Sequence, residues 1–447
     1  MSLTTPDAAT VAGPVLTPTD PGYAAELAGF NVATVQTPDI VVGATSADDV
    51  AAAVRYARDH GLRVGVRATG HGPVVEGNGY LTIVTSRMTE VSVDPVTRTA
   101  RVGAGARWRD VIAATAAHGL SGLVGSSSSV GVVGYTLGGG LSPLGRQFGY
   151  AADHVRSIEV VTADGTIRTV DAGAGPDLFW ALLGGRDGCG IVTAVEFDLI
   201  ELSSIYGGGI FFAGSAAEQV LHAWRRWAPT LPEEAGTSVA ILRLPPDPAL
   251  PAPLQGQMAV HVRFTYTGDP AIGAQLLAPM TTAGPVLLQN VAVMPVAALD
   301  AVHMDPPGPM PSIERGSALR ELPAEAVDAV LAVAGPAVAS PLAIVELRLL
   351  GGKLAAPQGV PNSVTARSAA YNILAIAVPA GAAAELAGPH VGAVNAAVAP
   401  WADGAALNFA GQTPAVELPE LWSPDDCDRL SAIRERHDPD GVFRRTA

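Results

Sequence analysis

The sequence predicts an α+β fold built in two parts, and three observations support this. Strand-like and helix-like segments alternate between residues 37 and 200, which indicates one mixed unit in two lobes. Beyond residue 204, long apolar strands alternate with alanine-rich helices, a pattern typical of an antiparallel sheet covered by helices on one side. A capped helix follows near the C-terminus. We expect domains at 1–203 and 204–403 and a C-terminal segment at 404–447.

The first part is expected to begin with a short helix near residues 23–30 and a strand at 38–44. The next helix should begin after Ser46, a suitable N-cap, and end at Gly61. Later, the Asp164-Gly165 pair predicts a hairpin turn between two strands. The other expected strands are RVGVR, LTIV, EVSVD, TARVGAG and IVTAVEFDLIEL, and the other helices are RWRDVIAATAAHG and PDLFWALLG.

The second part is expected to contain five strands, GGGIFFAG, SVAILRL, QMAVHVRFTYTG, PLAIVELRLLGG and AAYNILAIAV. The proline-rich segments LPPDPALPAP and DPPGPMP are typical of loops. The last helix should begin after Ser423 as its N-cap, and Asp438-Pro439 should form a turn behind it.

Composition narrows the class of function. The chain has 447 residues, of which 48% are hydrophobic, and a formal net charge of −15 at pH 7. Such an acidic chain is a poor partner for nucleic acid or an anionic membrane. The two cysteines, Cys189 and Cys427, lack metal-site spacing, so we expect no metal. We expect reduced thiols in a cytoplasmic protein, with a disulfide between the two as the alternative. The abundance of Ala, Gly and Pro is typical of a GC-rich bacterial genome. Neither a signal peptide nor an apolar run long enough for a membrane span is expected.

The segment GSSSSVGVVGYTLGGG, residues 125–140, is rich in glycine and has four consecutive serines. Such a backbone can approach a ligand closely and present many N–H groups to it. It is not a P-loop, because the only lysine of the chain, Lys353, is far away in the sequence. Its glycine spacing also does not fit the dinucleotide fingerprint G-x-G-x-x-G. Glycine content alone leaves a packing or linker loop open as the alternative.

Further motifs, taken in order, resemble those of a known family. RATGHG carries Arg67, Gly70 and His71 in the pattern R-x-x-G-H, and the glycine run continues as GYTLGGGLSPLGRQFGYAADHV. DLFWALLGG, GIVTAVEFDL and RLSAIRERHDPDGVFR follow. Together they resemble the vanillyl-alcohol-oxidase or berberine-bridge-enzyme-like FAD-linked oxidoreductases over essentially the whole chain, most weakly from 204 to 400. The resemblance implies a PCMH-type FAD-binding first domain, a substrate-binding second domain, and a C-terminal segment packed back on the first.

The resemblance implies that FAD is held by the two loops, with glycine N–H groups on its pyrophosphate. It also implies a covalent bond from His71 to the flavin 8α-methyl group, for which a neutral imidazole is a suitable nucleophile. A loop histidine bonded to the backbone is the alternative. The expected cofactor-binding residues are Arg67, Ala68, Thr69, Gly70, His71, Gly125, Ser126, Ser127, Ser128, Val130, Gly131, Gly134, Gly138, Gly139, Gly140, Leu141, Gly190, Ile191, Val192 and Asn408.

The serine run bears on the number of covalent links. Many relatives have a cysteine here that makes a second link, at flavin C6, and alignment on Val130-Gly131 places Ser127 at that position. Because a serine hydroxyl is a poor nucleophile without a base, we expect a single link. A polar cap before the next helix is an equally open reading of the serines. Val130 stands where relatives place a residue that affects oxygen access, and its small size favours an oxidase.

The substrate side departs from the family pattern. Ala406 replaces the tyrosine of Tyr-x-Asn-Tyr/Phe, whereas Asn408 remains to support the flavin. Glu346 and Arg348 alternate on one expected strand and therefore share a face. Glu346 is a candidate base, and Arg348 would lower its pKa or bind an anion, although a solvated outward-facing pair is the commoner situation. Tyr371 is the third catalytic candidate, and Tyr80, His261, Tyr266 and His303 are unranked ones.

These observations predict an FAD-dependent oxidase with one covalent link. It would oxidise an alcohol, sugar or secondary-metabolite C–H by hydride transfer to flavin N5 and reoxidise with O₂ to give H₂O₂, its partners being the small-molecule substrate and O₂. Two alternatives stay open. One is a flavoprotein that catalyses cyclisation, isomerisation or elimination without net oxidation, and the other is a flavin-binding protein without turnover.

Overall fold

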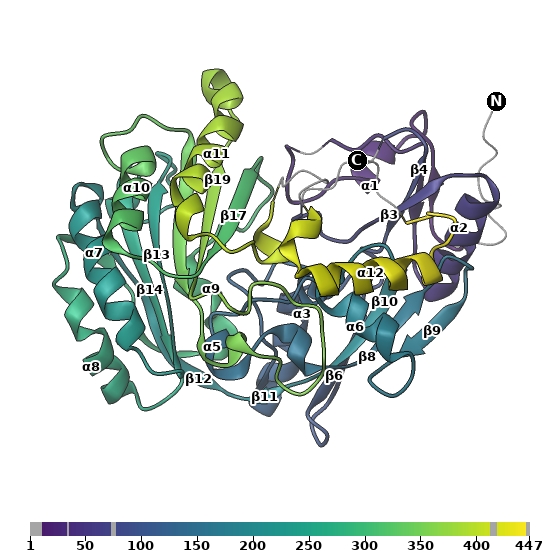
Figure 1. Cartoon of the computed structure of the whole chain (residues 1–447), viewed down its shortest axis with the longest axis horizontal. Helices are drawn as coiled ribbons and strands as arrows, with labels where there is room; N and C mark the ends of the chain where they lie inside the picture. The colour runs from purple at the N-terminus through teal and green to yellow at the C-terminus, as the bar shows by residue number, and fades with distance from the viewer. Residues whose placement is uncertain (1–10, 34, 73–76, 412–417, 444–447) are drawn as a thin grey trace.

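The computed structural model describes residues 11–33, 35–72, 77–411 and 418–443. Figure 1 shows two halves side by side, one built from the N-terminal residues and the other around a large sheet. This arrangement confirms the α+β class. Part of the N-terminus, and the final Arg444 of the C-terminal motif, lie outside the described residues. Within the described ranges, no helix is long and apolar enough to cross a bilayer.

The first half contains a small mixed sheet with strand order β1-β2-β4-β3. Its strands are β1 (Val15–Leu16), β2 (Ile40–Gly43), β3 (Arg63–Arg67) and β4 (Tyr80–Val84), with β2, β3 and β4 parallel. Helix α2 (Ala47–Asp59) packs its alanine and valine side chains against this sheet. The Ser46 hydroxyl accepts a hydrogen bond from the N–H of Asp49, which confirms the predicted N-cap.

A second, antiparallel sheet follows in the first half, with strand order β5-β6-β10-β8-β9. The strands are β5 (Val91–Asp94), β6 (Thr99–Gly103), β8 (Val155–Val161), β9 (Ile167–Val170) and β10 (Ile191–Asp198). Its apolar side chains share one core with the helices α3 (Trp108–Thr115), α4 (Val132–Leu137) and α6 (Pro176–Gly185). Gly165 has a positive φ of 72° in the β8–β9 turn, which confirms the predicted hairpin.

The second half is built on an antiparallel sheet with strand order β15-β12-β14-β13-β18-β19-β17, beside which β16 pairs with β12. The strands are β12 (Ser204–Ala213), β13 (Ala235–Arg243), β14 (Met258–Tyr266), β15 (Val286–Gln289), β16 (Ala292–Pro295), β17 (Ile313–Leu319), β18 (Leu342–Leu349) and β19 (Tyr371–Ala377). Strands β15, β16 and β17 were not predicted from the sequence. In β17, IERGSAL lacks both a continuous apolar run and a clean alternation, so only its pairing with β19 reveals it as a strand.

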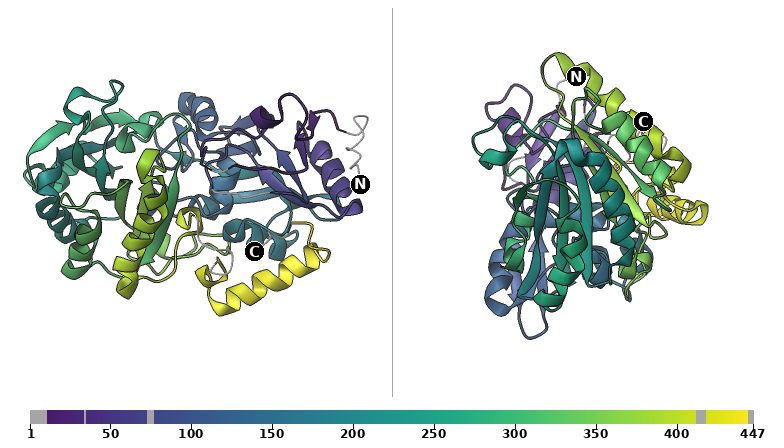
Figure 2. Two further views of the ribbon diagram at one scale, coloured as in Figure 1. Left: turned by 90° about the horizontal axis from the view of Figure 1, so that it is seen from above. Right: turned by 90° about the vertical axis from the view of Figure 1, so that its left-hand side faces the viewer.

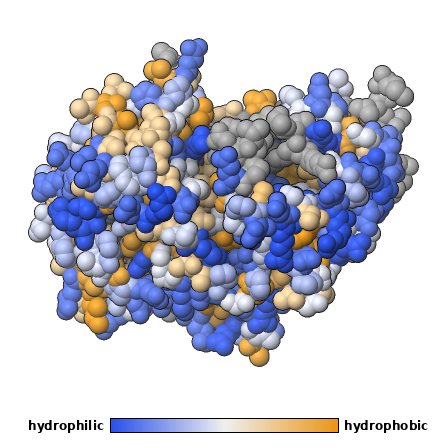
Figure 3. All heavy atoms as spheres, in the orientation of Figure 1, coloured by the Kyte–Doolittle hydropathy of each residue, from blue (hydrophilic) through white to orange (hydrophobic). Residues whose placement is uncertain are grey.

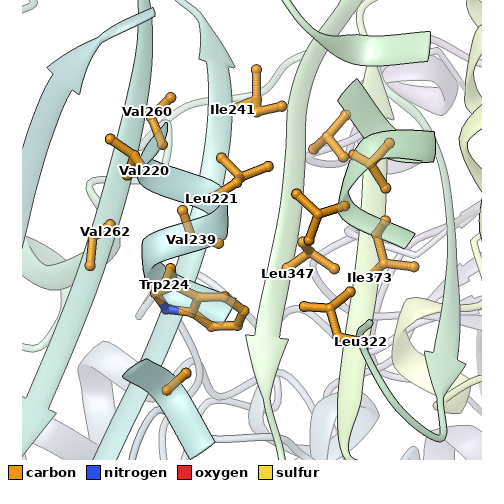
Figure 4. Close-up of a cluster of buried hydrophobic side chains, with 14 of the residues drawn as sticks. Val220, Leu221, Trp224, Val239, Ile241, Val260, Val262, Leu322, Leu347 and Ile373 are labelled. Carbon is orange, nitrogen blue, oxygen red and sulfur yellow. The ribbon is translucent and has the colours of Figure 1, made fainter. Parts of the chain in front are cut away.

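The long helices of this half cover one face of the sheet (Figures 1 and 2). They are α7 (Ala217–Trp227), α8 (Pro270–Thr281), α10 (Ala324–Ala334) and α11 (Ala387–Val398). Figure 4 shows the core between the two layers, where Trp224 of α7 packs over Val239 and Leu347 of the sheet. The opposite face is turned toward the first half, as shown by the hydrogen bond from Thr265 Oγ1 to the carbonyl of Pro143, 3.1 Å long. The outer surface in Figure 3 is mostly hydrophilic, with hydrophobic residues in small separate groups.

The end of the chain returns to the first half. Helix α12 (Pro424–His437) begins after Ser423, whose hydroxyl accepts from the N–H of Asp426, and it packs against α6. Beyond it, the N–H of Val64 donates to the carbonyl of Val442 at 2.7 Å. Figure 2 shows this last helix alongside the N-terminal half.

Candidate active site

The loop after β3 carries the motif residues Arg67 to His71 and is fixed by an earlier segment. The N–H of Phe30 donates to the Thr69 carbonyl at 3.0 Å, and that of Asn31 donates to Gly70 at 2.9 Å. The Phe30 ring stacks on the His71 imidazole, with ring centroids 3.9 Å apart. Gly70 has a φ of 68°, which only glycine adopts without strain. The imidazole is therefore held in one orientation before any cofactor binds.

The serine-rich loop lies directly beside this histidine. Ser129 Oγ is 3.3 Å from His71 Nε2, and Ser129 Oγ also bonds Ser127 Oγ at 2.8 Å. The N–H of Gly131 donates to Thr69 Oγ1 at 3.3 Å. The structure thus brings together two groups of predicted cofactor residues that are more than fifty positions apart in the sequence.

The surroundings of His71 set its protonation state. Its pKa is lowered to about 4, mainly by desolvation and also by the nearby charge of Arg107, whereas the hydrogen bond to Ser129 acts in the opposite direction. The imidazole is neutral at pH 7, which leaves one ring nitrogen with a free lone pair. If Nε2 carries the proton and donates it to Ser129, Nδ1 is the nitrogen available as a nucleophile.

The serine loop is also tied to the second half. The N–H and the hydroxyl of Ser128 both donate to the carboxylate of Asp300, the N–H at 2.8 Å. Asp300 opens the short helix α9 (Asp300–His303), which lies over β12 and β14. A single element of the second half therefore contacts both the serine loop and, through His303, the sheet.

The structure places different demands on the glycines at 134–140. A Cβ on Gly134 would meet nothing within 4 Å, so this position leaves open space beside the loops. Gly139 and Gly140 have φ values of 107° and 76°. A Cβ on Gly138 would instead overlap Asn408, whose side-chain amide donates to the Tyr135 carbonyl at 2.8 Å. Packing against Asn408 therefore requires a glycine at position 138, and its cofactor contact stays a prediction.

We expect Gly138→Ala to lower the free energy of unfolding by about 1–3 kcal/mol, because the new methyl group overlaps a held side chain. Chemical denaturation measures the change. Adding Asn408→Ala removes the overlap and should recover stability, at the loss of one hydrogen bond of about 1 kcal/mol. If the double variant is as unstable as the sum of the single ones, packing against Asn408 is not the reason for this glycine.

The remaining predicted cofactor residues, Gly190, Ile191 and Val192, lie at the start of β10. The side chains of Ile191 and Val192 are buried in the two cores of the first half. Only the backbone of this segment is left for a cofactor. The two loops, with a neutral histidine, hydroxyls and an uncrowded Gly134, fit a large polar cofactor such as FAD.

Glu346 and Arg348 occupy the sheet face that is turned toward the first half, on which the short helix α9 also lies. Glu346 binds Arg263 Nη1 at 2.8 Å and Arg348 Nη2 at 3.1 Å, and His303 Nε2 is 3.3 Å from Arg348 Nη2. Both Glu346 and Arg348 are only 6% exposed, so the alternative of a solvated outward pair is wrong. Their neighbour Phe409 lies under the Arg348 guanidinium, 5.5 Å from it.

The surroundings of Glu346 also weigh against its predicted role as a base. Burial would raise its pKa, but the two guanidiniums outweigh burial and hold it well below the usual range. A carboxylate so stabilised in its ionised form accepts a proton poorly at neutral pH. On the same face, two strands away, burial raises the pKa of Glu314 on β17 to about 7, which suits proton transfer.

Tyr371 lies on the opposite face of the sheet. It is a partner of Leu349 in the ladder and packs edge-on against Trp224 of the covering helix, with ring centroids 6.0 Å apart. Alternation along β19 instead turns Asn372 toward the first half, opposite Arg348. The prediction of Tyr371 as a catalytic residue is therefore wrong, because its side chain belongs to the core.

Sequence reasoning missed the partners that complete this cluster. Arg263, Ser238 and Asn372 lie on β14, β13 and β19, and each faces the same side as Arg348 through the ladder register. His261 and Arg263 alternate within one strand, a signal that was visible in the sequence. The contact of Arg263 with Glu346 could not be predicted from the sequence, because it depends on which strands are neighbours in the sheet. Among the described residues, no group of three metal-ligating side chains is gathered together.

Comparison with known proteins adds to this geometry. Residues 38–171 match a family described as FAD binding domain. The (R)-6-hydroxynicotine oxidase of Paenarthrobacter nicotinovorans is 28% identical, covering 97% of this chain and 96% of its own. Among solved structures, 6-hydroxy-D-nicotine oxidase of Arthrobacter nicotinovorans has a TM-score of 0.83 at 25% identity, with 97% of both chains covered.

Two more distant structures share the fold. A berberine-bridge-enzyme-like protein of Physcomitrella patens has a TM-score of 0.84 at 18% identity, covering 97% of this chain and 96% of its own. A glucooligosaccharide oxidase of Acremonium strictum has a TM-score of 0.82 at 21% identity, with the same coverage, and carries a 6-S-cysteinyl, 8α-N1-histidyl FAD.

Proposed function

The chain belongs to the berberine-bridge-enzyme-like FAD-linked oxidoreductases, and on that premise we propose that it is an oxidase with its flavin bound covalently through His71. The observation that supports this most directly is the position of His71, a half-buried neutral imidazole fixed between Phe30 and Ser129. The FAD-binding part would comprise residues 1–203 together with 404–447, and residues 204–403 would bind the substrate.

FAD, when bound, supplies a two-electron acceptor at N5 that O₂ can reoxidise. The overall change would be R₂CHOH + O₂ → R₂CO + H₂O₂, or the corresponding change at a carbon bearing nitrogen. The chain's own residues would bind and orient the substrate between the loops and the sheet. Glu314 is the carboxyl on this face whose pKa suits a proton acceptor, whereas Glu346 would serve to hold Arg263 and Arg348 in place.

A single covalent link is supported by the serine loop. In the Acremonium enzyme the FAD is bonded to both a histidine and a cysteine. Here Ser127 hydrogen-bonds Ser129. A second bond to the flavin would need a thiolate, whereas the serines of this loop carry hydroxyls, which are poor nucleophiles without a base. We therefore propose attachment at His71 alone.

The substrate is proposed as a small alcohol, sugar or secondary metabolite. The relatives act on hydroxynicotine and on oligosaccharides, as their names state. Hydroxynicotine and oligosaccharides differ widely in size and polarity. The substrate class therefore depends on the side chains of the sheet face that carries Glu346 and Arg348, and not on family membership.

Anaerobic mixing with candidate substrates tests the oxidase function. A substrate should bleach the flavin absorbance near 450 nm, and air should restore the colour with release of about one H₂O₂ per flavin reduced, as the reaction requires. Turnover of a compound without bleaching or peroxide would instead support the alternative of chemistry without net oxidation. Failure of every member of a broad panel to bleach a protein with bound flavin would favour a binding protein.

A further inference from the structure

A small cavity lies between the two halves, beside the charge cluster. One wall is formed by Leu141 and Ser142, directly after the triple glycine, and the other by Ser238 and Arg348 of the sheet. About 20 Å³ of it is accessible to water, which is room for one or two water molecules. This is enough for a small polar group and too little for a ring. The cavity is therefore suited to one end of a ligand whose remainder lies elsewhere between the halves.

The charge around the cavity is positive. Three arginines line it, Arg146, Arg263 and Arg348, and none of the described residues that line it is acidic. Arg146 donates to main-chain carbonyls, among them that of Ala235 at 2.9 Å. Glu346 balances only one of the other two guanidiniums. Desolvation holds the pKa of His303 below its usual value, so this histidine is neutral at pH 7 and does not change the balance.

Buried polar atoms without a partner surround this cavity. Among the described residues, these include Ser238 Oγ, His303 Nδ1 and Arg348 Nε, and all three residues line the cavity. Their side chains are at least nine-tenths buried, with residue exposures of 2%, 5% and 6%. A buried donor without an acceptor costs about 1–3 kcal/mol, so such atoms are normally paired.

The hydrogen-bonding roles of these atoms decide which ligand group the cavity can bind. Arg348 Nε can only donate, and the Ser238 hydroxyl can donate as well. His303 Nε2 lies 3.3 Å from Arg348 Nη2, which donates, and 3.5 Å from Glu346 Oε1, which accepts, so His303 Nδ1 donates in one tautomer and accepts in the other. The cavity thus presents two donors, a histidine nitrogen and an excess of positive charge to one small volume.

We propose that this cavity binds the carboxylate of an acidic substrate, so that the compounds oxidised are alcohols or amines that also carry a carboxylate. This rests on the proposed oxidase function and specifies its substrate class. A carboxylate supplies acceptor lone pairs for Arg348 Nε and the Ser238 hydroxyl, and a negative charge for the guanidiniums. Its two oxygens replace the one or two waters for which the cavity has room.

Calorimetric titration of the holoenzyme tests this without turnover. The probes are formate, acetate and benzoate, each compared with its neutral amide, formamide, acetamide or benzamide. At least one carboxylate should bind ten-fold or more tightly than its amide, because charged hydrogen bonds to guanidinium are the stronger ones. Arg348→Gln should abolish that preference, and Ser238→Ala should reduce it about three- to ten-fold. Arg98→Gln, an exposed arginine of the first half, is the control and should leave it unchanged.

Three outcomes would overturn the proposal. They are equal binding of carboxylates and amides by the wild-type protein, an unchanged preference in folded Arg348→Gln, and an unchanged preference in Ser238→Ala. Melting temperature and flavin content show whether a variant is folded, and Ser238→Ala serves if Arg348→Gln is not. A protein that holds no flavin or bleaches with no substrate contradicts the oxidase function instead, while the titrations still report on the cavity.

Discussion

Replacing Glu346 with alanine is expected to lower the free energy of unfolding by about 3–5 kcal/mol, because it leaves two guanidiniums buried without their counter-charge. Arg263 and Arg348 are 3% and 6% exposed, and both bind this one carboxylate. Without the carboxylate, no opposite charge offsets the desolvation free energy of the two guanidiniums in the folded state. Denaturant unfolding of the purified variant, followed by circular dichroism, measures the loss.

The control for this variant is Glu201→Ala. Glu201 also pairs with an arginine, Arg98, but the two side chains are 71% and 52% exposed. An exposed pair contributes at most about 1 kcal/mol, so the control should change little. If Glu346→Ala and Glu201→Ala are equally stable, water hydrates the guanidiniums of Arg263 and Arg348, and the Glu346 carboxylate does not stabilise them.

Acid precipitation of the protein is expected to leave the yellow colour in the pellet for the wild type and to release it for His71→Ala. Acid unfolds the chain and removes every non-covalent contact, so only a bond to the flavin retains the colour. In His71→Ala the neighbouring hydroxyls of Ser127 and Ser129 remain, but hydroxyls without a base are poor nucleophiles. Absorbance of pellet and supernatant near 450 nm measures the partition.

His60→Ala is the matched control, because His60 is exposed at the end of α2 and lies outside both loops. It should retain the colour as the wild type does. Colour in the supernatant of the wild-type protein would mean an FAD enzyme without a covalent link. Colour in the pellet of His71→Ala would mean that another residue makes the bond.

Much of the fold follows from local sequence. The α2 helix, its Ser46 cap, the Asp164-Gly165 hairpin and the last helix depend on neighbours within a few positions, and local signals therefore predict them. The five apolar strands of the large sheet were visible for the same reason. Strand β17 was not, because IERGSAL is held by its partner β19 and by contacts with the C-terminal segment near Phe409.

The site divides in the same way. The sequence by itself determined the two loops, because RATGHG and the glycine run carry their signals in adjacent residues. It also placed Glu346 and Arg348 on one face, since alternation in a strand is local. Only the tertiary structure decided which face that is. Pairing of β18 with β13 and β19 buried the pair and turned Tyr371 into the core. Strand β14, next to β13, and helix α9 added Arg263 and His303. Burial and charge balance depend on such long-range contacts, and these set both the acidity of Glu346 and the excess positive charge beside the cavity.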